Sequence, residues 1–206
     1  DEDMHIENVG GTVAMIERAK DLKEEKSQSF SVSADMYHRF GAFQTNLLIE
    51  GFYTRLTDVF VLGKPYDRGD GILVKTRSNG PGAKVMGLTL EGKVAYLSIL
   101  QIQAGLTLQR SRYDEPHKWH DDAPAEKKIF RTPDTYGYFT ATCTPIKPLS
   151  IALSGTYTGR MLVQRMDITA ENAELGKMPE RKAEAIRTPR FFDLGVKLAY
   201  DFKLYK

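Results

Sequence analysis

The last fifteen residues of the chain, FDLGVKLAYDFKLYK (192–206), carry the pattern that decides the fold. Apolar side chains occupy every second position from Phe192 to Leu204, and charged or small residues occupy the positions between them. An extended strand points successive side chains to opposite faces, so this segment presents one apolar face and one polar face. The apolar face has to be buried, either against a protein core or against lipid.

The same alternation runs through most of the remaining chain. Phe30, Val32 and Met36, for example, alternate with serines and Asp35. This period of two is the signature of half-buried strands. The strands predicted in this way are 27–40, 45–62, 72–79, 85–97, 99–113, 135–145, 149–164 and 192–204.

These strands are expected to belong to one domain. We predict a single β-barrel segment over residues 1–206, with roughly seven or eight strands between 27 and 206. Residues 1–26 are predicted to form a loop, in which VAMIERAKDLKEEK (13–26) could wind into one or two helical turns.

Two kinds of connection alternate along the chain. Short turns are expected at GAFQ (41–44), AYLSI (95–99) and IKPLS (146–150), and long polar loops at 63–71, 113–134 and 165–190. This alternation places every long loop at one end of an antiparallel meander. Such loops, together with strands well above the usual 5–6 residues, are typical of outer-membrane barrels.

The predicted fold class is therefore all-β: an antiparallel up-and-down meander that forms a segment of a transmembrane β-barrel. The alternative is a soluble antiparallel β-sandwich, in which the apolar faces of 27–40 and 192–204 would pack together in a dry core. A third possibility is a structural protein that assembles through the unpaired edges of its sheet.

Composition and motifs exclude several functions. The formal net charge of +2 gives no basic surplus for nucleic acid. The single cysteine, Cys143, rules out an internal disulfide and a cysteine-rich zinc site, and we expect an inert thiol on the face of Gly137 and Phe139. No phosphate-binding loop or catalytic motif occurs, so we predict neither an enzyme nor a cofactor.

Four stretches of the chain together carry a family likeness. They are DEDMHIENVGG (1–11) with Leu22, Glu25 and Ser27 of a Leu-x-x-Glu-x-Ser pattern; NLLIEGFYTRLTDVF (46–60); Asn79, Gly80, Gly87 and Glu91 at the entry of a strand; and IFRTPDTYGYF (129–139). These stretches resemble the C-terminal barrel region of TonB-dependent outer-membrane receptors of the Bacteroidetes type, which include siderophore, cobalamin and colicin receptors.

The resemblance implies a parent barrel of about 22 strands with a plug in its lumen. The chain would supply roughly seven of those strands, without the plug domain, the energy-coupling box or the final strands. The parent protein would lie in the cell outer membrane and contact outer-membrane lipid, its own plug and its remaining strands. It would couple to a TonB-type complex through the absent regions.

The same resemblance assigns the connections to the two sides of the membrane and leaves the strand register of one segment open. The short turns would be periplasmic, and the long loops extracellular. Because Pro81 and Gly82 interrupt the family pattern, the register of residues 63–90 stays open. Segment 72–79 could lie in a loop or could belong to one long strand.

The most polar loop holds the candidate ligand-binding residues. In DEPHKWHDD (114–122), His117, His120 and Asp121 could contact a ligand, and Trp119 could stack on it. Arg160, on the polar face of the predicted strand 149–164, could meet the plug or an anionic substrate. No metal site is predicted, because two histidines three residues apart in a loop have no enforced geometry.

The expected function is non-catalytic. The chain would be part of an outer-membrane active-transport receptor that binds and imports a scarce small-molecule ligand, such as a siderophore or cobalamin, with TonB energy coupling. The alternative is a soluble β-sandwich module that binds a peptide or glycan through its loops. The receptor hypothesis expects interfacial aromatic side chains at Tyr113, Tyr136, Tyr200 and Tyr205.

Overall fold

The computed structural model describes residues 6–9, 12–63, 66–69, 72–119, 123–168 and 181–202. In these ranges the regular structure consists of strands only, in three separate sheets. The described residues contain no helix with the length and apolar character needed to cross a membrane.

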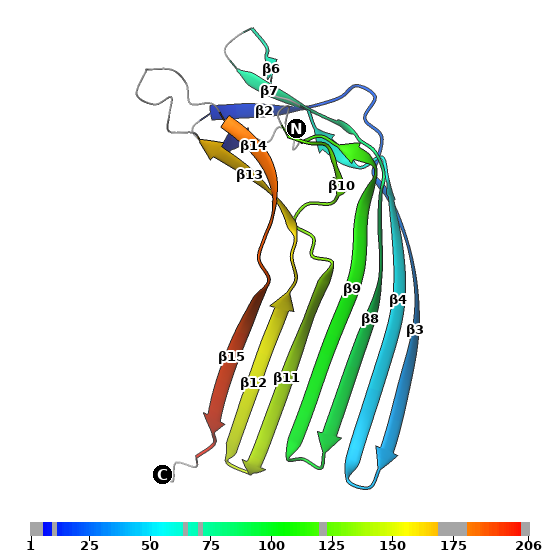
Figure 1. The fold of residues 1–206 in the computed structure, drawn as a ribbon, viewed down its shortest axis with the longest axis vertical. Helices are drawn as coiled ribbons and strands as arrows, with labels where there is room; N and C mark the ends of the chain where they lie inside the picture. Colours follow the sequence, from blue (N-terminus) through cyan, green and yellow to red (C-terminus); the bar gives the residue numbers. More distant parts are fainter. Residues whose placement is uncertain are drawn as a thin grey trace.

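Seven long strands form the main sheet and lie side by side in chain order (Figure 1). Each pairs antiparallel with the next, which confirms the predicted up-and-down meander. A short strand, β10 (Glu126–Lys128), pairs with the far end of β9, beyond the residues that pair with β11. The seven strands are β3 (Lys26–Phe40), β4 (Phe43–Thr57), β8 (Ala83–Tyr96), β9 (Leu100–His117), β11 (Thr135–Ile146), β12 (Leu149–Thr158) and β15 (Phe191–Tyr200).

The two ends of the main sheet differ. Tight turns close one end, and every longer connection lies at the other end (Figure 1). Gly41 has a φ of 59° and Leu97 a φ of 50°, the left-handed conformation that a tight hairpin turn demands. Short turns thus fix the pairing at one end, and the other end carries the variable connections.

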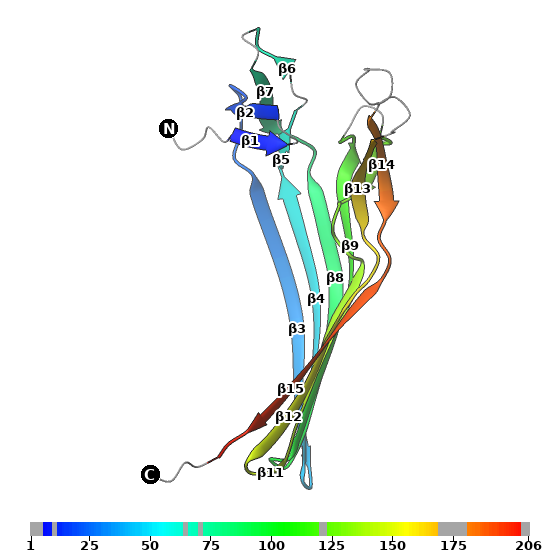
Figure 2. The same cartoon turned by 90° about the vertical axis from the view of Figure 1, so that its left-hand side faces the viewer.

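The main sheet is one curved layer (Figure 2). In a sandwich, the apolar sides of β3 and β15 would pack together, yet these strands lie at opposite edges of the sheet. Val32 is 80% exposed and Val196 is 72% exposed. The sandwich alternative is therefore wrong, because no other described strand covers these faces.

The N-terminal segment differs from the prediction. Residues 1–26 contain two strands, β1 (Ile6–Val9) and β2 (Thr12–Arg18), in place of a loop with helical turns. Strand β2 pairs in parallel with β7 (Leu73–Asn79), and Ile16 is buried there. These backbone hydrogen bonds and this burial outweigh the helical preference of a short Ala-, Glu- and Lys-rich segment.

Two predicted strands are shorter than expected because the chain leaves the main sheet. The segment predicted as 45–62 breaks at Asp58, where φ is 54°, and resumes as β5 (Phe60–Leu62) in the second sheet. The segment predicted as 149–164 ends at Thr158.

A separate hairpin begins in the last residues of the predicted strand 149–164 and extends into the segment predicted as the loop 165–190. Its strands are β13 (Leu162–Ile168) and β14 (Arg181–Arg187). Residues 169–180, between these two strands, lie outside the described residues.

Asn79 joins the second sheet to the main sheet and settles the open register. Strand β7 ends at Asn79, and the three residues 80–82 separate it from β8, so 72–79 is a strand of its own. β7 also pairs with β5 and with β6 (Tyr66–Asp67). The Asn79 side chain accepts a hydrogen bond from Lys23 N at 2.7 Å and donates to Lys23 O at 2.9 Å and Asp58 O at 2.8 Å. One amide thus holds the entry of β3 beside the exit of β4.

Strand β11 packs tightly against β9 at Gly137. A Cβ atom at this position would lie 2.5 Å from the carbonyl oxygen of Gly105, which belongs to the backbone and cannot rotate away. Gly51 is the matched opposite case on the same face of the sheet, because a Cβ atom there meets no atom within 4 Å. Of these two positions, close approach of the backbones requires glycine at 137 and not at 51.

We expect Gly137→Ala to lower the free energy of unfolding by about 1–3 kcal/mol, because the added methyl group forces the backbone to shift. Gly51→Ala should change it by less than about 1 kcal/mol. Urea unfolding in detergent micelles, followed by far-UV circular dichroism, measures both. Equal losses in the two variants would show that the close approach at Gly137 does not hold.

Candidate functional site

Backbone pairing aligns every second side chain of the seven long strands on one apolar face. Ile49, for example, lies between Ala34 and Leu90, and Leu153 lies between Ala141 and Val196. The larger side chains of this face are exposed: Phe30, Val32, Met36, Leu47, Met86, Leu88, Leu90, Leu106, Leu108, Leu153, Leu194, Val196 and Leu198. A continuous apolar surface of this extent marks an interaction site.

The height of the apolar face matches a bilayer. On β4 it runs from Phe43 to Tyr53, about 34 Å along the strand at about 3.4 Å per residue. With the tilt of about 45° typical of barrel strands, this corresponds to about 24 Å across the membrane. Outer-membrane barrels carry an outward apolar band about 25 Å tall.

Aromatic rings gather at the short-turn end of this face. The ring centroid of Phe43 lies 5.6 Å from that of Phe40 and 4.8 Å from that of Tyr96. These three positions flank the first two turns, a signal that the sequence offered but that we did not use. Such rings suit the boundary between acyl chains and headgroups.

The structure places the predicted aromatic residues on different faces of the main sheet. Tyr200 lies on the apolar face, opposite Leu149. Tyr136 pairs with Thr107, and Tyr113 pairs with Ala83, which places both on the other face of the sheet. Neighbouring residues of a strand point to opposite faces, so an error of one residue in the predicted register moves a side chain to the other face. Next to a loop, the sequence pattern does not show which residues belong to which face. Tyr205 lies outside the described residues.

The opposite face is polar and linked across strands. Ser29 and Thr54 hydroxyls lie 2.9 Å apart, and those of Thr89 and Thr107 lie 3.0 Å apart. Other polar residues of this face are Ser31, Ser33, Asp35, Asn46, Glu50, Glu91, Lys93, Gln101, Gln103, Tyr138, Thr140, Ser154, Asp193 and Lys197. This face can contact water or a polar partner.

The three predicted ligand-binding residues that the structure describes have different surroundings. His117 ends β9, and its ring centroid lies 5.4 Å from that of Tyr113. Trp119 packs edge-on against Phe130, with 6.1 Å between centroids. Arg160 is exposed between β12 and β13, and no described contact joins it to the other two.

The remaining two candidates, His120 and Asp121, lie outside the described residues. Within the described part of the chain, no group of three or more His, Cys, Asp or Glu side chains could hold a metal ion.

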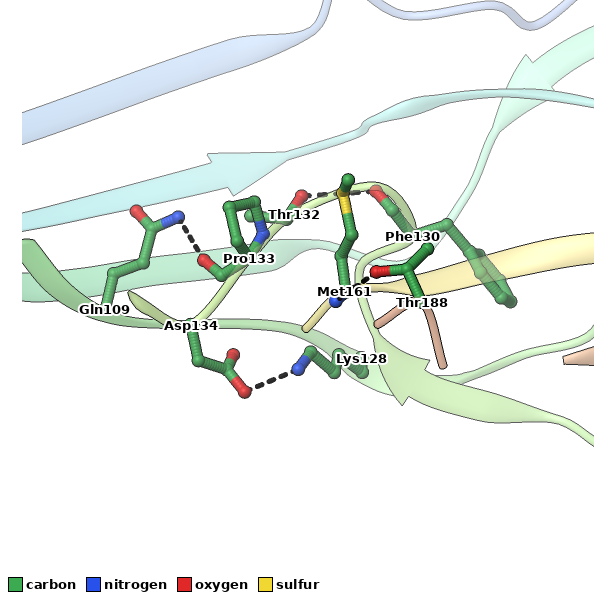
Figure 3. Close-up of polar contacts among 8 residues, drawn as sticks. All are labelled: Gln109, Lys128, Phe130, Thr132, Pro133, Asp134, Met161 and Thr188. Carbon is green, nitrogen blue, oxygen red and sulfur yellow. Dashed lines mark hydrogen bonds and ion pairs between the residues drawn. The ribbon is translucent and has the colours of Figure 1, made fainter. Parts of the chain in front are cut away.

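Residues 128–134 anchor the connections above the main sheet (Figure 3). The Gln109 side chain donates to Pro133 O at 2.9 Å, and Lys128 forms an ion pair with Asp134. Arg131 N donates to Leu162 O at 2.7 Å, which ties this segment to the β13–β14 hairpin. The hairpin is closed in turn by Met161 N, which donates to the Thr188 hydroxyl at 3.2 Å (Figure 3).

Asp114 links β4, β8 and β9 at the loop end. Its carboxylate pairs with Lys84 Nζ at 2.8 Å and with Arg55 Nη2 at 3.2 Å. The hydrogen bond from Lys84 lowers the pKa of Asp114 below its ordinary value of 3.8, and the positive charge of Arg55 adds to this effect. The loop-end register of the three strands therefore depends on a charged carboxylate.

The pKa of Asp114 is lowered only in the folded state, so its contribution to stability is present above the ordinary carboxyl pKa. It is lost as the pH falls through the lowered folded-state value. We expect Asp114→Asn to lower stability at pH 7 and to flatten the acid-side decline below about pH 4. Urea unfolding at several pH values measures this, with Asp193→Asn, an exposed carboxylate on β15, as the control. An unchanged acid-side profile in Asp114→Asn would refute the role of this ion pair.

No protein-family model and no curated protein sequence matches the chain. Several solved structures do match it. The FrpB iron transporter from Neisseria meningitidis (F3-3 variant) has a TM-score of 0.57 and 14% identity, over 91% of this chain and 26% of that chain. The F5-1 variant of the same transporter has a TM-score of 0.56 and 17% identity, over 91% and 26%.

A structure titled copper transporter OprC matches as well, with a TM-score of 0.55 and 13% identity over 89% of this chain and 24% of that chain. The chain thus spans about a quarter of the length of these proteins. At such identities the likeness concerns the fold alone. Together with the strand order, it shows that the chain folds as an all-β antiparallel meander, like a section of these solved structures.

Proposed function

We propose that the chain is a wall segment of an outer-membrane transport receptor of the TonB-dependent type. Its apolar face contacts lipid, its polar face bounds the lumen, and its long connections contribute to ligand capture. The observation that carries the proposal is the exposed apolar face, which continues across all seven long strands at the height of a bilayer.

Lipid is the covering that this face requires. Burial of apolar surface contributes about 25 cal/mol per Å², so an uncovered face of this extent would drive association in water. The apolar side chains lie on one side of a single curved layer, with aromatic rings gathered at its short-turn end. A bilayer supplies an apolar slab of matching thickness and a boundary that favours such rings.

The free edges of the sheet call for the rest of a barrel. In the described residues, β3 and β15 each pair on one side only. Unpaired backbone groups are costly in lipid, which is why strands cross membranes only in closed barrels. The remaining strands of the parent protein would pair with these edges, in keeping with a chain that covers about a quarter of its structural neighbours.

In the assembled receptor the polar face would meet the plug domain and water. The loops at the far end would contact a scarce ligand such as a siderophore or cobalamin, with His117, Trp119, His120, Asp121 and Arg160 as candidate contacts. Import would depend on TonB energy coupling through other parts of the receptor. The chain performs no catalytic step in this scheme; the titles of the structural neighbours name transporters of iron and copper.

Adjacent residues on β12 provide a sharp test of the two faces. Leu153 lies on the apolar face and Ser154 on the polar face, and both are exposed. Each is replaced by cysteine in a Cys143→Ala background, labelled with a nitroxide and reconstituted in lipid vesicles. We expect the label at residue 153 to collide preferentially with oxygen, which dissolves in lipid, and the label at residue 154 with a water-soluble nickel complex.

A second measurement covers the case in which the chain does not insert. Light scattering on a size-exclusion column reports the molar mass and the size distribution of the wild-type chain in plain buffer and in detergent. We expect one species of uniform mass in detergent and aggregates in plain buffer. Equal nickel accessibility at residues 153 and 154, or a compact species in plain buffer, would overturn the lipid-facing assignment.

A further inference from the structure

A row of basic side chains lies directly above the apolar face, at its loop end. In the strand register, Arg55 lies opposite Lys84, Lys84 opposite Arg112, and Arg112 opposite Lys128. One row of basic residues therefore crosses β4, β8, β9 and β10. Strand alternation places all four on the same side of the sheet as the apolar face. Arg110 lies two residues closer to the apolar face, opposite Met86. We call these five residues the basic row.

The basic row carries an excess of positive charge. Asp114 pairs with Arg55 and Lys84, and Asp134 pairs with Lys128. Arg110 and Arg112 are exposed, and neither takes part in an ion pair among the described contacts. Five cations against two carboxylates leave an excess of three charges, centred on the two guanidinium groups.

A depression of about 290 Å³ lies beside these two guanidinium groups. It is lined by Gln109, Arg110, Ser111, Arg112, Lys128, Asp134 and Arg187, so β14 brings a further cation to it. The guanidinium groups of Arg110 and Arg112 are donors that suit the oxygens of a phosphate group.

The apolar face is also notched below the row. Gly51 has open space where a Cβ would lie, within a hollow of about 580 Å³ lined by Phe30, Val32, Tyr53, Leu88 and their neighbours. This hollow is four residues below Arg55 along β4. The notch lies on β3, β4 and β8, and the basic row runs from β4 and β8 on to β9 and β10.

We propose that the basic row binds the phosphate groups of lipid headgroups in the leaflet on the loop side. This inference rests on the proposed membrane placement, because the row reaches headgroup height only if the apolar face spans the bilayer. Guanidinium groups bind phosphate through two parallel hydrogen bonds, which favours arginine at its centre. A soluble anion would not require the row to follow the edge of the apolar face across four strands.

Spin-labelled lipids test the proposal on the reconstituted chain. Labelled phosphatidic acid carries a phosphomonoester, and labelled phosphatidylcholine is the neutral reference. The measured quantity is the fraction of each labelled lipid whose motion is restricted by contact with the protein. For the wild type, we expect this fraction to be larger for phosphatidic acid than for phosphatidylcholine. Each basic residue near the surface changes lipid association about fivefold, so the double variant Arg110→Gln/Arg112→Gln should lose at least about tenfold of this preference.

A matched variant controls for net charge. Lys93 and Lys197 lie on the polar face, so Lys93→Gln/Lys197→Gln removes the same two charges away from the row. This control should keep the wild-type preference, and far-UV circular dichroism should show the same strand content in all three proteins. A loss of equal size in the control would overturn the proposal, because a general charge effect would then explain the preference.

The remaining outcomes separate the inference from the function on which it rests. If neither lipid is restricted, the chain does not face lipid and the proposed function fails. If both lipids are restricted equally, the membrane placement stands and the basic row has no lipid role. The preference for phosphatidic acid is also measured in about 10 mM inorganic phosphate, and it is expected to persist because each basic residue near the surface contributes about 1 kcal/mol to lipid association. If the phosphate abolishes the preference, the row binds free anions and the lipid assignment is wrong.

Discussion

The structure depends on one constraint: the backbone hydrogen bonds of seven strands are in a register that preserves the parity of side chains across the whole sheet. From Val32 through Gly51 and Leu88 to Leu108, each residue of a cross-strand row points to the same side as its neighbour. A slip of one residue between any two strands would place serines and glutamines among leucines. Both faces, and every surface built on them, follow from this register.

The ends of the sheet protect the register in different ways. At one end, turns of two or three residues leave no freedom to slip. At the other end, the connections are long, and polar side chains provide the constraint: Asn79 holds β3, β4 and β7 together, and Asp114 holds β4, β8 and β9. Charged and amide groups suit this end, because it lies outside the apolar band.

Much of the fold follows from period-two alternation, which is why the main strands and the meander were predictable from segments such as 27–40 and 192–204. The second sheet was not predictable, because β2 has the sequence pattern of a helical stretch and becomes a strand through its pairing with β1 and β7. The break at Asp58 depends on a left-handed residue that no pattern marks. For the site, the sequence pointed to His117, Trp119 and Arg160, whose role as ligand contacts stays a prediction. It missed the basic row, whose members come from four strands and form a row only through the pairing of those strands.

The asymmetry between turns and loops limits how such a chain can diverge. One residue inserted within β9 would invert the facing of everything beyond it, so the wall accepts changes in length only in pairs or in whole hairpins. An insertion of any size at the loop end leaves the alternation of the strands intact, since β10 and the β13–β14 hairpin already lie there without disturbing the main sheet. The connections at the loop end can therefore change in length and composition while the main sheet stays the same.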